Sequence, residues 1–132
     1  MDVDVIIVGA GLAGLSAANE IASRSRASVI VVERLVIGAN NPTPMTFVDV
    51  LGRFGLEECT LGRYNQFAFH SPLGNQSTHA FGEVQLVALA YQRACLKLLD
   101  TASMAGNVWM YSASATRLDR QEKGWLMTLN DG

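Results

Sequence analysis

Residues 3–14 read VDVIIVGAGLAG, an aliphatic run that passes directly into a glycine-rich turn. The run at 3–8 has no polar face, which is typical of a strand buried on both sides of a parallel sheet. The turn at 9–14 has the spacing G-x-G-x-x-G. Residues 12–23, rich in Ala, Ser and Leu, predict a helix, and 29–32 predicts a second buried strand. We therefore expect one βαβ unit with parallel strands.

The glycines of the turn each have a physical task in binding a dinucleotide. Gly9 permits the tight turn out of the strand, Gly11 lets the backbone approach a pyrophosphate, and Gly14 lets the helix pack close to the strand. The start of the helix, at Leu12 and Ala13, offers free N–H groups and a partial positive charge to that pyrophosphate. These residues are our candidates for the phosphate-binding part of a site.

Glu33 ends the second predicted strand, 19 residues after Gly14. Its carboxylate can accept hydrogen bonds from a ribose diol and would repel a 2′-phosphate, which argues against NADP as the ligand. A glycine-rich turn with a structural task alone is the competing interpretation, but the strand, the helix and the acid are all in register here. The glycines do not separate FAD from NAD, because both contain ADP. The motif thus predicts dinucleotide binding without naming the dinucleotide.

Residues 36–90 predict a loop, a short helix and a hairpin. Glycine, asparagine and proline mark the loop. The helix is expected over 47–54, with Thr46 as its cap and Gly55 at its end. The alternating pattern on both sides of a proline-glycine turn predicts an antiparallel hairpin over 66–81.

Residues 91–132 predict a helix followed by strands. Apolar residues at helical spacing indicate a helix over 91–105. Residues 84–89 fit either the first turns of this helix or a strand that leads into it. A strand at 108–112 and a hairpin over 115–130 follow. The expected fold class is α/β: a Rossmann-like βαβ start with an antiparallel hairpin insertion and a β-meander.

The composition excludes several classes of protein and site. Of 132 residues, 49% are hydrophobic and 17% charged, which describes a packed globule and not a disordered or fibrous chain. The net charge is -2 without a Lys/Arg cluster, so nucleic acid is not expected as a partner. Cys59, Cys95, His70 and His79 have no zinc-site spacing, and we expect no metal site.

The apolar run at the start of the chain predicts neither a signal peptide nor a transmembrane segment. Asp2 and Asp4 stand before it where a signal peptide has Lys or Arg, and glycines interrupt it. It is also shorter than the ~20 residues needed to cross a bilayer. Since the two cysteines imply no disulfide framework, we expect a cytoplasmic location.

The opening block resembles a known family. Residues 4–18 (DVIIVGAGLAGLSAA), with VVER at 31–34 and IG at 37–38, are similar to the start of FAD-dependent oxidoreductases of the p-hydroxybenzoate-hydroxylase fold. Within that group the chain looks most like the geranylgeranyl reductase and lycopene cyclase branch. Looser similarities to that branch are SPLG (71–74), YQRAC (91–95) and NDG (130–132).

The resemblance implies FAD as the cofactor, with its adenosine on residues 9–14 and Glu33. It implies that Arg34 lies along the adenine or ribose, and that the backbone at Ala115 touches the adenine. It further implies an FAD-dependent oxidoreductase with an apolar, isoprenoid-type substrate, NAD(P)H as a candidate reductant and a location that can be peripheral to a membrane. It assigns no catalytic residue.

The family's second FAD motif, a Gly-Asp pair, is absent from this sequence. Residues 1–132 are therefore expected to be the N-terminal part of an FAD/NAD(P)-binding domain, with the βαβ motif at 1–35. Two alternatives stay open: an NAD-binding dehydrogenase domain, and a non-catalytic dinucleotide-binding fragment. For Arg34 the alternative is an exposed charge after a strand. His70 and His79 could line a substrate cavity, although exposed strand histidines are at least as common.

Overall fold

The computed structural model describes residues 1–39 and 44–130 and divides the chain into two compact units. The first unit comprises Met1–Asn40 and Cys95–Gly132, and the second comprises Asn41–Ala94. Part of the loop predicted after the βαβ unit, residues 40–43, lies outside the described residues. Each unit is described below by itself.

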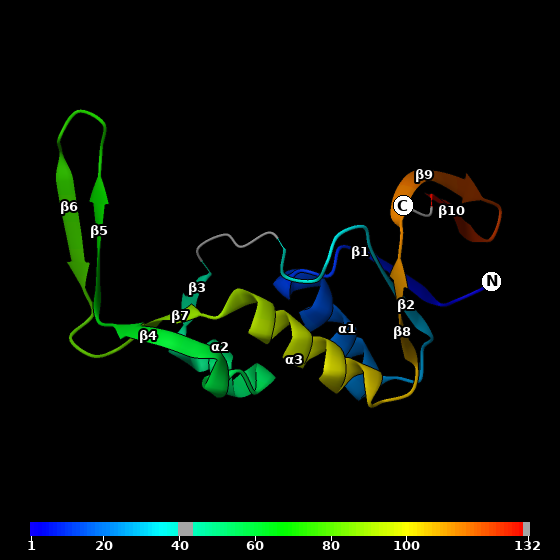
Figure 1. Cartoon of the computed structure of the whole chain (residues 1–132), viewed down its shortest axis with the longest axis horizontal. Coiled ribbons are helices and arrows are strands. Elements are labelled where there is room, and N and C mark those ends of the chain that lie inside the picture. Colours follow the sequence, from blue (N-terminus) through cyan, green and yellow to red (C-terminus); the bar gives the residue numbers. More distant parts are fainter. Residues whose placement is uncertain (40–43, 131–132) are drawn as a thin grey trace. The chain divides into compact units, whose positions relative to one another are not determined.

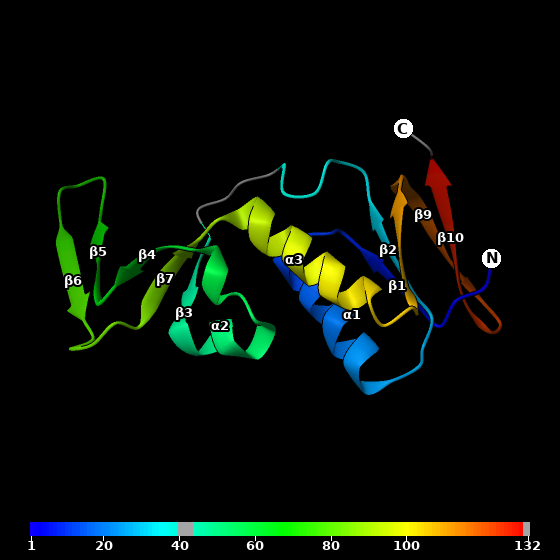
Figure 2. The ribbon, with the colours of Figure 1, turned by 60° about the horizontal axis from the view of Figure 1, so that its bottom comes forward.

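The first unit is built on a parallel sheet. Strands β1 (Val5–Val8), β2 (Val29–Glu33) and β8 (Val108–Ser112) pair in the order β1-β2-β8 (Figures 1 and 2). Helix α1 (Leu12–Arg24) connects β1 to β2, which confirms the predicted βαβ unit. Helix α3 (Tyr91–Ser103) leads to β8, and the Asn19 side-chain amide of α1 donates to the Leu98 carbonyl at 2.6 Å.

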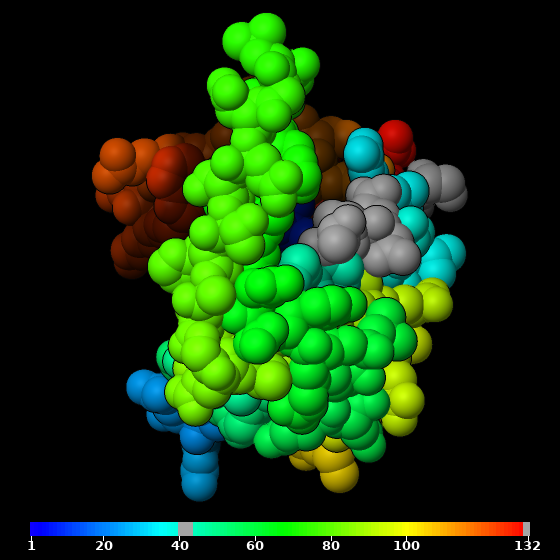
Figure 3. Space-filling view, turned by 90° about the vertical axis from the view of Figure 1, so that its left-hand side faces the viewer, coloured from blue at the N-terminus to red at the C-terminus, as the bar shows by residue number. Residues whose placement is uncertain are grey.

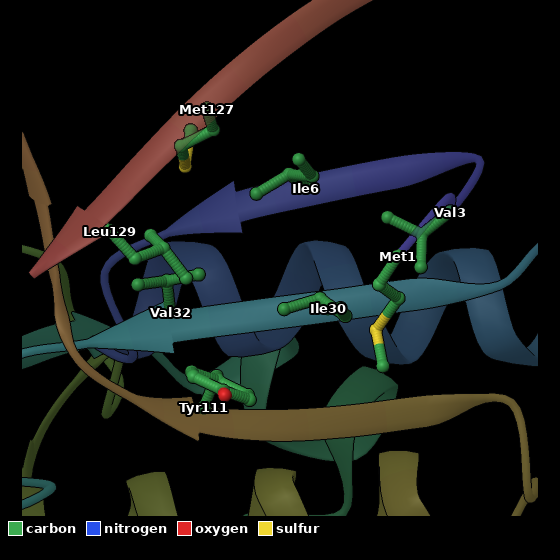
Figure 4. Close-up of a pocket in the computed structure, with 8 residues that line it drawn as sticks. All are labelled: Met1, Val3, Ile6, Ile30, Val32, Tyr111, Met127 and Leu129. Atoms are coloured by element: carbon green, nitrogen blue, oxygen red, sulfur yellow. The ribbon is translucent and has the colours of Figure 1, made fainter. Parts of the chain in front are cut away.

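Alternation along the strands gives this sheet two apolar faces. Ile7 faces α1, since a side-chain carbon of Ile7 lies 3.1 Å from the position that a Cβ on Gly14 would take. On the opposite face, β9 (Ser114–Gln121) and β10 (Gly124–Asn130) form an antiparallel hairpin. Met127 and Leu129 of β10 pack against Ile30 and Val32 of β2 (Figure 4).

The hairpin covers the middle of this face and leaves its margins open. Ile30 and Val32 are buried on β2, whereas Val8 on β1 is 59% exposed and Trp109 on β8 is 50% exposed. A cavity of about 220 Å³ remains between sheet and hairpin (Figure 4). Its lining residues are Met1, Val3, Ile6, Ile30, Val32, Tyr111, Met127 and Leu129. Its lining side chains are apolar apart from the Tyr111 hydroxyl, and none belongs to the glycine turn.

The second unit contains a small antiparallel sheet and a separate hairpin. Strands β3 (Met45–Phe47), β7 (Leu86–Leu89) and β4 (Thr60–Tyr64) pair in the order β3-β7-β4. A short helix, α2 (Val48–Phe54), and a 3₁₀ turn, η1 (Glu57–Cys59), connect β3 to β4. The prediction left open whether residues before 91 are helix or strand, and the structure has strand there.

The separate hairpin joins β5 (Gln66–His70) to β6 (Gln76–Ala80), as predicted. It projects beyond the other elements of its unit and appears in green in the space-filling view (Figure 3). Phe67 lies at the centre of a ring cluster on one face, 5.0 Å from Phe69, 5.5 Å from His79 and 5.6 Å from Phe81 between centroids. Cross-strand aromatic contacts of this kind stabilise a two-stranded ribbon that would be marginal alone.

The predicted cap of α2 is wrong. Thr46 lies in β3 opposite Val87, and Phe47 is the residue at the N-cap, without a side-chain cap bond. The N–H of Val48 donates instead to the carbonyl of Gln85 at 2.9 Å. The carbonyl of Gln85, next to the start of β7, therefore accepts the hydrogen bond that the prediction assigned to the Thr46 hydroxyl. The predicted end is right, because Gly55 has φ 63° in the left-handed region.

A reciprocal set of hydrogen bonds ties the start of β1 to the start of β2. The carboxylate of Asp4 accepts from the Ser28 N–H at 2.8 Å and from the Ser28 hydroxyl at 2.7 Å, while the Asp4 N–H donates to that hydroxyl oxygen at 2.9 Å. The hydroxyl and then the N–H of Ser28 lower the pKa of Asp4 below its ordinary value of 3.8. The ionised carboxylate is thus the form that the fold favours.

We expect the Asp4→Asn variant to be less stable than the parent at pH 7 and equally stable in strong acid. A lowered folded-state pKa contributes stability above the unfolded pKa, and that contribution disappears as pH falls through the folded-state pKa. Urea unfolding of both proteins at several pH values measures this convergence. Asp2→Asn is the control for loss of one charge. A stability difference for Asp4→Asn that stays constant from neutral to acid pH would contradict the assignment.

Candidate dinucleotide-binding site

The glycine turn has the geometry that its sequence predicts. Gly9 has φ 103°, a conformation that L side chains rarely adopt, and its N–H donates to the Val32 carbonyl at 2.8 Å. Gly11 is the N-cap of α1 and provides no side-chain cap. The first backbone bond of the helix runs from the Leu15 N–H to the Gly11 carbonyl at 3.0 Å. The N–H groups just before Leu15 therefore have no carbonyl of the same helix to bind.

Gly14 permits the close approach of α1 to the turn. A Cβ on Gly14 would overlap the carbonyl oxygen of Gly9 and lie 3.1 Å from a side-chain carbon of Ile7. The backbone oxygen cannot move away without changing the turn itself. The absence of a side chain at this position therefore sets both the helix packing and the course of the turn.

Glu33 joins the glycine turn to the residues that follow β2. Its Oε2 accepts a hydrogen bond from the Ala10 N–H, and its Oε1 accepts one from the Leu35 N–H, both at 2.9 Å. Partial burial alone would raise the pKa of Glu33. The N–H groups of Leu35, Ala10 and Arg34, together with the positive charge of Arg34, outweigh burial and lower the pKa below its usual value. Glu33 is therefore an ionised acceptor at neutral pH.

A cleft of about 390 Å³ lies at the carboxyl ends of β1, β2 and β8. Its lining residues are Val8, Gly9, Val32, Glu33, Arg34, Leu35, Ala113, Ser114 and Ala115. Ligands of open α/β sheets bind at this edge, and the volume lies in the range of small-molecule sites. A larger groove of about 570 Å³ runs along β1 and β10, but it contains neither Gly9 nor Glu33. We therefore take the smaller cleft as the candidate site.

The structure brings most of the predicted site residues together. Gly9, Glu33, Arg34 and Ala115 line the cleft, and the turn continues from Gly9 into the others at the start of α1, namely Gly11, Leu12, Ala13 and Gly14. Sequence reasoning missed Leu35, Ala113 and Ser114. The Ala113 N–H donates to the Glu33 carbonyl at 3.0 Å, and this bond brings the segment after β8 to the site. No local sequence pattern predicts a contact between two residues that lie so far apart in the chain.

The other candidates lie elsewhere or form no site. His70 and His79 are on the β5–β6 hairpin, where the His79 ring lies 4.9 Å from that of Phe81. Cys59 and Cys95 are buried and are not disulfide-bonded. In the part of the chain that the structure describes, no three His, Cys, Asp or Glu side chains are placed to hold a metal ion. Within residues 1–39 and 44–130, no helix has the length and apolarity needed to cross a membrane.

Comparison with protein families gives a match over the βαβ unit. Residues 4–37 match the model of the FAD binding domain. The βαβ unit is thus similar to the FAD binding domain. The match runs from the start of β1 through the glycine turn and α1 to the loop after Glu33, so it covers the residues whose geometry is described above. Curated protein sequences give no match to the chain.

Solved structures extend the likeness from the βαβ unit to the fold of nearly the whole chain. A p-nitrophenol 4-monooxygenase from Pseudomonas putida DLL-E4 superposes with a TM-score of 0.74 at 17% identity, over 95% of this chain and 35% of its own. A geranylgeranyl bacteriochlorophyll reductase-like protein from Thermoplasma acidophilum gives 0.71 at 18% identity, over 91% and 32%. The flavin-dependent monooxygenase PieE, solved with FAD and substrate, gives 0.72 at 19% identity, over 99% and 27%.

The chain spans about a third of the length of these solved structures. The comparisons confirm the expected resemblance to FAD-dependent oxidoreductases, the α/β fold with a βαβ start, and FAD as the cofactor of the matched family. They also agree with the expectation of a partial domain, since the matched region in each neighbour is a minor part of that chain.

Proposed function

We propose that this chain binds the ADP half of FAD and is the FAD-binding part of a flavin-dependent oxidoreductase. One observation supports the proposal above all others: Gly9 and Glu33 line the same cleft, and the Glu33 carboxylate accepts from the Ala10 N–H of the glycine turn. These residues all lie in the region that matches the FAD binding domain. The residues present fit the cofactor, since Gly14 has no room for a side chain and Glu33 is ionised.

Each part of the site has a task in this proposal. The N–H groups at Gly11, Leu12 and Ala13, together with the positive end of the α1 dipole, bind the pyrophosphate. Glu33 accepts hydrogen bonds from the ribose hydroxyls and disfavours a 2′-phosphate by charge repulsion. Arg34 and Ala115 line the cleft, and in this proposal the Arg34 side chain and the backbone at Ala115 contact the adenine.

FAD, when bound, supplies the redox chemistry of its isoalloxazine ring. The residues of this chain hold the other end of the cofactor, and we assign none of them to the reaction. We propose an apolar, isoprenoid-type substrate and NAD(P)H as the reductant. The substrate class rests on the resemblance in sequence and on the geranylgeranyl bacteriochlorophyll reductase-like neighbour.

The proposal is tested by placing a negative charge at the start of α1. Ala13 is exposed and the first turn of the helix contains no acidic residue, so Ala13→Asp should leave the fold intact and strengthen the helix by about 0.3–1 kcal/mol. The same charge would repel a pyrophosphate at the helix N-terminus. We expect Ala13→Asp to bind FAD and ADP about tenfold more weakly than Ala13→Asn, which corresponds to about 1.4 kcal/mol.

Flavin fluorescence titration measures FAD binding, and calorimetry measures ADP and NADP⁺ binding. The parent chain should bind FAD and ADP and should discriminate against NADP⁺. Equal FAD affinity of the two Ala13 variants would show that the pyrophosphate does not lie at this helix end. A folded parent chain without affinity for FAD or ADP would overturn the proposed function for the chain.

A further inference from the structure

Glu33 is the point at which three connections of the cleft meet. One carboxylate oxygen accepts from Ala10 in the glycine turn, and the other accepts from Leu35 in the segment after β2. The carbonyl of the same residue accepts from Ala113 in the segment after β8. Donors and acceptors of these bonds all belong to the chain, so the bonds are part of the architecture of the site itself.

The bond to Ala10 also has a consequence for the glycine turn. Ala10 is 2% exposed, and a buried N–H without a partner is costly. Its glycine neighbours have more backbone freedom than other residues, so a turn of this composition orders only at an entropic cost. The Glu33 carboxylate fixes the turn by holding its one non-glycine residue between Gly9 and Gly11.

We propose that Glu33 is a positioning residue that holds the glycine turn in its binding conformation before the dinucleotide arrives, in addition to receiving the ribose. The ligand part of this statement rests on the proposed function. The two tasks do not compete, since a carboxylate offers about four lone-pair positions and the Ala10 and Leu35 N–H groups occupy two of them, on different oxygens. The Ala10 N–H consequently donates to Glu33 and not to a phosphate.

The two tasks can be separated with a ligand that has no ribose diol. ADP and 2′,3′-dideoxy-ADP share the base and the pyrophosphate, and only ADP presents both hydroxyls to a carboxylate. Glu33→Gln keeps the size of the side chain but turns one acceptor into an NH₂ donor, which faces either the Ala10 or the Leu35 N–H. If Glu33 serves the ribose alone, this variant leaves the affinity for dideoxy-ADP unchanged.

We expect Glu33→Gln to weaken dideoxy-ADP binding by about tenfold, because the phosphate-binding turn is no longer held. The loss for ADP should be larger, since the ribose contact is lost as well. Glu20→Gln is the matched control, because Glu20 is an acid of the same unit that pairs with Arg24 on α1 at 2.8 Å. It should leave both affinities unchanged. An unchanged affinity of Glu33→Gln for dideoxy-ADP would overturn the positioning role.

Amide hydrogen exchange of the ligand-free chain provides a second readout that does not depend on binding. In Glu33→Gln the Ala10 or the Leu35 amide should exchange at least tenfold faster, whereas Ile7 within β1 should exchange at the parental rate. Unchanged protection of both amides would overturn the proposal. If the parent binds neither nucleotide, the proposed function fails, and the exchange measurement still decides whether Glu33 holds the turn.

Discussion

The Gly14→Ala variant is expected to be less stable than the parent by about 2 kcal/mol and to lose most of its affinity for FAD. Alanine favours a helix over glycine by up to about 1 kcal/mol. The added methyl group, however, overlaps the Gly9 carbonyl oxygen and lies close to Ile7. Overpacking of this kind costs up to about 3 kcal/mol, and here the obstacle is backbone that cannot change rotamer. The steric cost therefore exceeds the gain in helix propensity.

The affinity falls in the same variant because relief of the overlap requires the helix or the turn to move. Either shift displaces the N–H groups at the start of α1 from the Gly9 end of the cleft. We expect at least a tenfold loss of FAD affinity in the fraction that is folded. Flavin titration gives the affinity, and urea unfolding gives the stability.

Gly52 provides the matched control in a second helix. A Cβ on Gly52 would meet only a carboxylate oxygen of Glu57 at 3.7 Å, an ordinary van der Waals distance. Gly52→Ala should therefore stabilise α2, by up to about 1 kcal/mol, and leave FAD affinity unchanged. The same substitution is thus expected to have opposite effects at two helical positions. Parental stability and affinity of Gly14→Ala would contradict the packing described for the glycine turn.

The βαβ unit could be predicted from the sequence because its signals are local. The aliphatic runs, the glycine spacing and the acid at the end of the second strand are all contained in residues 3–34. The burial of the first strand was predicted wrongly, because β1 is an edge strand whose Ile6 and Val8 are 37% and 59% exposed. The observed elements, from β1 (Val5–Val8) to β2 (Val29–Glu33), agree with the predicted ones within two residues. The hairpins at 66–81 and 115–130 were predictable for the same reason: each is an alternating pattern around a turn.

Elements that depend on distant partners could not be predicted in this way. β3 has three residues and pairs with a strand that begins 39 positions further on, at Leu86. β4 contains an irregularity between Thr60 and Gly62 that breaks its alternation. The misassigned cap at Thr46 has the same origin, since the carbonyl of Gln85 satisfies the amide concerned. In each case a long-range backbone contact overrides a weak local preference.

The candidate site likewise has one part that local sequence signals predict and one part that depends on long-range contacts. One wall of the cleft, with Gly9 and Glu33, follows from motif chemistry. The opposite wall at Ala113–Ala115 follows only from the pairing of β8 with β2, and Ala115 was expected there through family resemblance alone. The motif also predicts an acid free to receive ribose. The structure adds that both oxygens of Glu33 already hold backbone amides, which no spacing rule contains.

The second large effect is expected from Leu15→Ala, which should reduce the free energy of unfolding by about 3 kcal/mol. Leu15 has no exposed surface, and truncation of a fully buried leucine removes its hydrophobic contribution and leaves a cavity. Alanine is as good a helix former, so the loss cannot be attributed to helix propensity. Urea unfolding measures the effect. Leu96→Ala on α3 is the control, because Leu96 is 44% exposed and should lose less than about 1 kcal/mol.

Leu15→Ala and Gly14→Ala, at adjacent positions, separate stability from site geometry. The Leu15 substitution leaves a void behind the helix but adds no atom against the glycine turn, and its backbone N–H still bonds the Gly11 carbonyl. We therefore expect the folded fraction of Leu15→Ala to bind FAD within about threefold of the parent, a difference of less than about 1 kcal/mol. A loss of affinity in Leu15→Ala as large as in Gly14→Ala would mean that helix packing in general, rather than the close contact at Gly14, controls the site.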